Sequence, residues 1–95
     1  MKIRQVKKQV RDFVFRNTKA DAIQVMIYEG DLIVDIAEFH QDWNRIGGLY
    51  GGSRGAGVAD WVAERRNCTA CEIKAFNLKD DGPSHETVNI PLTSW

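Results

Sequence analysis

The strongest constraint on the fold of this chain is a pair of apolar, β-branched runs on either side of a short connection. Residues 22–28 and 32–39 flank Glu29, Gly30 and Asp31, and this pattern predicts an antiparallel β-hairpin. Side chains two residues apart share one face of a strand, so one face of each strand is expected to meet the core. With Trp61 and Val62 packed nearby, the residues expected to be buried are Ile23, Val25, Ile27, Leu32, Val34 and Ile36.

Helical patterns precede and follow this hairpin. Apolar residues recur at helical spacing over residues 3–16, and residues 56–66 combine that spacing with good helix formers. Asp60 lies toward the start of the second segment and Arg65 and Arg66 at its end, which complements the helix macrodipole. The alternative for this segment is a strand over residues 58–64.

The C-terminal part of the chain predicts a second pair of strands. Residues 71–78 and 86–92 alternate as strands around a turn-rich segment, and Pro91 is typical of a strand at a sheet edge. The 95 residues therefore predict a single α+β domain spanning residues 1–95, in the order α-β-β-α-β-β. We expect an antiparallel sheet of about four strands with both helices on one face.

The charge of the chain is unevenly distributed, although its formal total is zero. Residues 1–20 hold seven basic residues and one acidic residue, so the remainder carries a net charge of −6. Lys7, Lys8 and Arg11 are candidate contacts to phosphates or to an acidic protein, and the alternative is a solvated helix face that pairs with the acidic remainder. No apolar run approaches the ~20 residues of a membrane span, and no secretory signal is evident, so we expect a cytoplasmic protein.

A glycine-rich stretch, residues 45–57, divides the two halves. Six of its thirteen residues are glycine, and Arg45 and Arg54 are its only charges. Glycine lets a loop turn its amides toward a ligand, which makes Arg45, Tyr50, Ser53 and Arg54 candidate binding residues. The sequence matches neither nucleotide-binding fingerprint, so the ligand is not specified.

Four residues with metal-binding side chains form a weak zinc pattern. Cys68 and Cys71 have zinc-ligand spacing, and His40 and His85 would complete the set if the fold brought all four together. The favoured interpretation is a pair of reduced, partly buried structural cysteines.

Residues 57–62 and 70–75 carry Asp60 and the Glu72-x-Lys74 motif. This pattern resembles the core of PD-(D/E)xK nucleases, particularly the virus-type replication-repair nucleases and Holliday-junction resolvases. The resemblance covers residues 54–76 and implies that Asp60 and Glu72 bind Mg²⁺ or Mn²⁺, while Lys74 orients the attacking water. It requires residues 58–64 to form a strand.

Taken together, these patterns favour a small non-catalytic binding or regulatory module, of a size found among viral or plasmid accessory proteins, without a cofactor. It would recognise a protein or a nucleic acid through the glycine-rich stretch and the basic N-terminal helix, and a homo-oligomer is compatible with the pattern. The alternative function is a metal-dependent nuclease acting on DNA.

Overall fold

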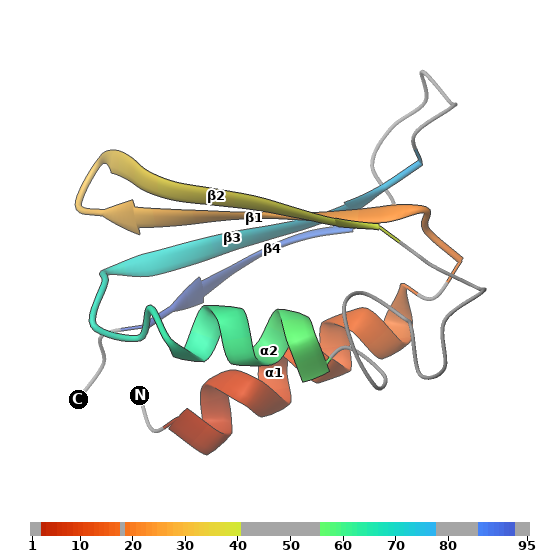
Figure 1. The fold of residues 1–95 in the computed structure, drawn as a ribbon, viewed down its shortest axis with the longest axis horizontal. Helices are drawn as coiled ribbons and strands as arrows, with labels where there is room; N and C mark the ends of the chain where they lie inside the picture. Colours follow the sequence, from red (N-terminus) through yellow and green to blue (C-terminus); the bar gives the residue numbers. More distant parts are fainter. Residues whose placement is uncertain (1–2, 18, 41–55, 78–85, 93–95) are drawn as a thin grey trace.

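The computed structural model describes residues 3–17, 19–40, 56–77 and 86–92, and within them the chain forms an α+β domain. A four-stranded antiparallel sheet in the order β2-β1-β3-β4 carries both helices on one face (Figure 1). The predicted fold class and element order are confirmed. The elements are α1 (Ile3–Arg16), β1 (Ala22–Glu29), β2 (Leu32–His40), α2 (Ala56–Ala63), β3 (Ala70–Phe76) and β4 (Glu86–Pro91).

The core lies between the helices and the sheet. Val6, Val10, Phe13 and Val14 of α1 are fully buried, as their spacing predicts, whereas Ile3 at the start of the helix is exposed. Helix α2 packs beside α1. Because alternate residues of β1 and β3 point toward the helices, each of these strands contributes one apolar face. The largest buried side chains are Phe13, Ile23, Ile27, Ile73, Ile90, Leu92, Val6, Val10, Val14, Val25 and Val58.

The predicted burial of β1 is confirmed, but the predicted burial of β2 is wrong. Ile27 lies opposite Asp35, so the face of β2 that points toward the helices carries Asp35, Ala37 and Phe39. Leu32, Val34 and Ile36 retain 71%, 52% and 54% of their accessible surface.

The reason lies in the hairpin register. Gly30 has a φ of 63°, the left-handed conformation that glycine adopts without strain, and it closes a tight turn. The register then shifts between Ile27 and Tyr28. Ile33 pairs with Tyr28 and Asp35 pairs with Ile27, although Ile27 and Tyr28 are adjacent in β1. A shift of one residue exchanges the two faces of a strand.

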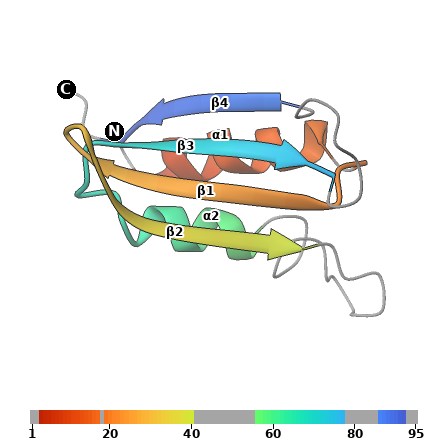
Figure 2. The same ribbon diagram turned by 90° about the horizontal axis from the view of Figure 1, so that it is seen from above.

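The two edges of the sheet are built differently. Strand β4 forms one edge, and Pro91 lies there as the sequence predicts. Strand β2 forms the other edge, above α2 in the fold (Figures 1 and 2). Neither described helix has the length and apolar character needed to cross a membrane.

Candidate functional site

An exposed apolar strip runs along the edge strand β2. It consists of Leu32, Ile33, Val34 and Ile36, hereafter the β2 strip. Among the described residues, these four are the majority of the six large hydrophobic side chains that are exposed. Single exposed apolar residues are ordinary, whereas a group gathered on one strand is a feature of interaction surfaces.

The β2 strip adjoins a sheet face over which no described helix lies (Figure 1). Cross-strand pairing places Ile36, Met26, Glu72 and Asn89 in one row across that face. Met26 and Glu72 are half-buried, whereas Asn89 is exposed. The face therefore changes from apolar at β2 to charged at β3 and polar at β4.

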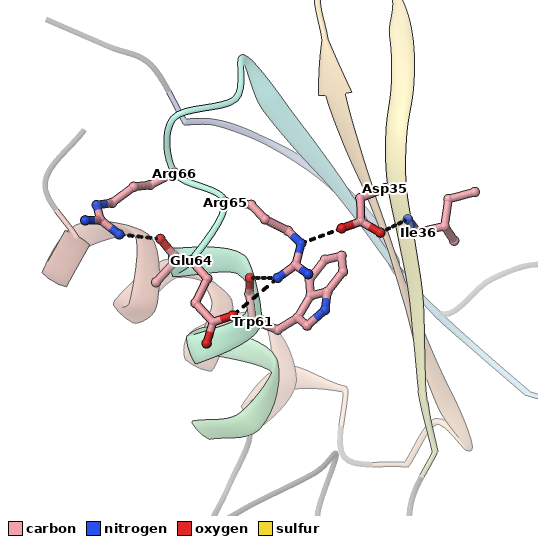
Figure 3. Close-up of polar contacts among 7 residues, drawn as sticks. Asp35, Ile36, Trp61, Glu64, Arg65 and Arg66 are labelled. Carbon is pink, nitrogen blue, oxygen red and sulfur yellow. Dashed lines mark hydrogen bonds and ion pairs between the residues drawn. The ribbon is translucent and has the colours of Figure 1, made fainter.

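A second cluster holds β2 in this orientation from the helix side. The Arg65 Nε donates to Asp35 Oδ2 at 2.7 Å, and its Nη1 donates to the Trp61 carbonyl oxygen at 2.8 Å (Figure 3). The guanidinium also stacks 3.6 Å from the centre of the Trp61 ring. Asp35 is thereby accommodated on the helix-facing side of β2, since a charge there needs a partner.

The same carboxylate also binds the backbone of its own strand. The amide N–H of Ile36 donates to Asp35 Oδ1 at 3.0 Å (Figure 3). The hydrogen bond from Arg65 lowers the pKa of Asp35, with further lowering from the charge of Arg65. On the same side of β2, Phe39 makes an edge-to-face contact with Trp61, with 6.0 Å between the centres of the two rings. An inward-pointing charge that occupies a strand amide discourages addition of another strand at that edge.

The predicted basic face of α1 is partly neutralised within the chain. Lys7 Nζ lies 3.1 Å from a carboxylate oxygen of Asp60, and Lys8 Nζ lies 2.8 Å from one of Asp12. Arg11 is exposed. The Lys7 contact matches the alternative in which the helix pairs with the acidic remainder of the chain.

Another ion pair joins the end of α1 to β4. Arg16 Nη2 lies 3.1 Å from Glu86 Oε2, and the buried Asn17 side chain donates to Glu86 Oε1 at 2.7 Å. Asn17 also donates to the Phe13 carbonyl oxygen at 2.8 Å. Hydrogen bonds from Arg16 and Asn17 lower the pKa of Glu86. This cluster has a structural role, because it fastens the edge strand β4 to α1.

The predicted loop site falls outside the described residues. Arg45, Tyr50, Ser53 and Arg54 belong to residues 41–55, which are not among the described residues. The glycine-rich stretch does end within α2, which begins at Ala56.

The structure does not bring together the residues of the nuclease resemblance. Residues 58–64 do not form a strand: α2 spans Ala56–Ala63, and the Asp60 side chain is 58% exposed beside Lys7. Glu72 and Lys74 alternate along β3 with buried residues and point to the opposite side of the sheet from the helices. Asp60 and Glu72 therefore cannot share one Mg²⁺ at ligand distances of about 2.0–2.1 Å.

The zinc pattern is likewise not assembled among the described residues. Cys68 and Cys71 are free thiols, and burial raises the pKa of Cys71 to about 12. Burial also raises the pKa of Cys68, with a contribution from Glu29. His40 lies at the end of β2 beside Glu38, and His85 is outside the described residues. The described part of the chain contains no group of three or more His, Cys, Asp or Glu side chains that could hold a metal ion.

Comparisons of the chain with protein-family models, with curated proteins and with solved structures find no match. Function is therefore inferred from the residues and their geometry alone.

Sequence patterns missed the β2 strip and the contacts that orient it. Two features of the sequence indicate them. The β2 segment contains neither proline nor lysine, the residues that commonly protect a sheet edge. Arg65 shares a helical face with Val58 and Trp61, so its charge faces the sheet and requires an acidic partner there.

Proposed function

We propose that this chain is a small, non-catalytic binding module and that it recognises another protein chain through the β2 strip. The observation that carries the proposal is the concentration of four exposed aliphatic side chains on one edge strand. Full burial of such a side chain contributes about 1.5–3 kcal/mol, so these half-exposed residues together contribute several kcal/mol to an apolar interface. A contact of this kind supports specific association when a polar rim surrounds it.

The chemistry of the strip favours a protein over a nucleic acid. Asp35 is paired with Arg65 on the helix-facing side, and the charged side chain that β2 carries on its other face is the acidic Glu38, which would repel phosphates. On α1, Lys7 and Lys8 already contact carboxylates of this chain. The glycine-rich stretch and the exposed Arg11 stay candidates for a second contact on sequence grounds.

Site-specific photo-cross-linking tests the proposal. A photoreactive amino acid is placed at Ile36 in the β2 strip and, as a matched control, at the exposed Thr87 on the other edge strand. In cells or extract, the probe at position 36 should give a defined protein adduct that is absent or much weaker at position 87. Adducts of nucleic acid alone at position 36, or equal adducts at both positions, would contradict the assignment.

A further inference from the structure

A row of basic side chains lies on the face of α1 that points away from the sheet. Arg4, Lys8 and Arg11 are three or four residues apart, and Phe15 follows four residues later. At that spacing the four side chains share one face of the helix, and all four are exposed. No described helix or strand covers this face (Figure 1). These four residues are called the α1 stripe below.

The charges of the α1 stripe are unfavourable for the helix that carries them. Arg4 lies in the first turn of α1, where the positive end of the helix dipole disfavours a cation, and that turn holds no acidic residue. Lys8 is four residues from Arg4 and three from Arg11, so neighbouring cations also repel each other. Charges that lower the stability of their own helix are expected where function requires them.

The fold leaves most of this charge without a partner. Arg4 and Arg11 form no ion pair with any of the described residues. Lys8 contacts Asp12, but the two side chains keep 75% and 48% of their accessible surface. An ion pair so open to solvent contributes little and opens readily. The α1 stripe therefore offers its positive charge to an anionic partner.

Phe15 narrows the chemistry of that partner. Its side chain is 49% exposed and lies one turn beyond Arg11 on the same face. A single strand of nucleic acid offers phosphates to the cations and the flat face of an unstacked base to the phenyl ring. A duplex keeps its bases stacked inside, and an acidic polypeptide offers carboxylates without a regular flat group. One aromatic side chain is too little apolar surface to hold a helix on a membrane.

From these features we propose that the α1 stripe binds single-stranded nucleic acid, with its three cations on phosphates and Phe15 stacked on a base. At 1.5 Å per residue the stripe is about 16 Å long, so it contacts only a few nucleotides and binds weakly. Contacts to phosphates and to the face of a base carry little sequence preference. The α1 stripe shares no residue with the β2 strip, so this second surface does not depend on the proposed function.

Fluorescence anisotropy with a labelled oligo(dT) strand of about 20 nucleotides tests the inference. The slope of log affinity against log salt concentration should be about −2, since each of three phosphate contacts to a single strand contributes about −0.7. Arg4→Glu and Arg11→Glu should each weaken binding about tenfold and flatten that slope. Lys74→Glu is the matched control, because it makes the same charge change on the sheet face away from the helices, and should bind nearly as the wild type does.

Two readouts separate binding from a purely structural role. Arg4→Glu places a carboxylate in the first turn of α1, so it should raise the thermal midpoint while it weakens binding. Phe15→Ala removes stacking but no charge, so it should lower the affinity about fivefold or more and leave the salt slope unchanged. Circular dichroism establishes that each variant is folded.

Absence of binding at low salt, or equal weakening by Lys74→Glu and Arg11→Glu, would overturn the inference. An unchanged affinity for Phe15→Ala would do the same, because it would leave only general charge attraction. Tighter binding of poly-glutamate than of the strand would assign the α1 stripe to an acidic protein. Tighter binding of phosphatidylserine-containing vesicles would assign it to a membrane surface. A lower thermal midpoint for Arg4→Glu would contradict the argument from the helix dipole.

Discussion

Two isoleucines on neighbouring strands make a sharp test of which face of each strand is buried. Ile27 of β1 is 0% exposed, whereas Ile36 of β2 is 54% exposed. Both are β-branched residues within a strand, so their replacement by alanine loses similar β-propensity. The difference between Ile27→Ala and Ile36→Ala therefore isolates the burial of the side chain.

The expected magnitudes follow from those exposures. Ile27 is enclosed by the core, so its truncation removes buried methyl groups, leaves a cavity, and should lower the free energy of unfolding by about 2–5 kcal/mol. Ile36→Ala removes the same atoms from a half-exposed position, so it leaves no cavity. At about 0.8 kcal/mol per buried CH₂, its truncation should cost roughly 1 kcal/mol.

Urea unfolding followed by circular dichroism, at a concentration where the chain is monomeric, measures both free energies. Thermal unfolding gives a second reading, since 1 kcal/mol shifts the midpoint by about 4–8 °C in a domain of this size. Equal losses for the two variants, or a larger loss for Ile36→Ala, would refute the orientation of β2 described here.

Three further predictions concern the ion pairs and the thiols. The pKa of Glu86 is lowered in the folded chain, so Glu86 stabilises the fold above its unfolded-state pKa, and this stability is lost as the pH falls through its folded-state pKa. In a plot of urea midpoint against pH, Glu86→Gln should therefore reduce the fall in the midpoint at acidic pH. An unchanged fall would contradict the pairing of Glu86 with Arg16. Cys71, with a pKa of about 12, should resist alkylation at pH 8 until the chain unfolds, as measured by peptide mass spectrometry. If Cys71 of the folded chain reacts as fast as Cys68, then Cys71 is not buried. Arg65→Met should lower the thermal midpoint, because it removes the ion pair and the aromatic stacking that hold β2 against α2, and an unchanged midpoint would show that these contacts add no stability.

Much of the fold follows from local patterns. The helical spacing of residues 3–16 predicts α1 with the bounds that the structure gives, and the glycine-containing connection at Gly30 predicts the hairpin. The helical interpretation of residues 56–66 holds for Ala56–Ala63. Each of these features depends on neighbours in sequence, which is why periodicity and turn chemistry suffice to find them.

The orientation of β2 could not be read from its own residues. Its alternate positions carry apolar side chains on both faces, and the Leu32, Val34 and Ile36 set is the more hydrophobic one. The observed choice depends on the hairpin register and on Arg65, which reaches Asp35 from thirty residues away. A tertiary contact of this kind overrides the local preference of the strand.

The predicted basic and metal-binding residues likewise depend on tertiary contacts. The sequence suggests separate sites for Lys7 and Asp60, whereas the fold pairs them with each other. Glu72 lies near Asp60 in sequence but projects from the other side of the sheet. Spacing along a chain identifies residues that suit a reaction, but their convergence depends on the packing of helix against sheet.

The central claim is that Ile36 of β2 points to solvent while Ala37 points toward the helices, and thiol labelling of these two positions tests it most directly. In a Cys68→Ser background, Ile36→Cys and Ala37→Cys each introduce one new thiol and leave the buried Cys71 as the only other cysteine. Measured at low protein concentration, the thiol at position 36 should react many times faster with a small maleimide than the thiol at position 37, which faces the helices beside Val25. Faster reaction at position 37 than at position 36 would contradict the account.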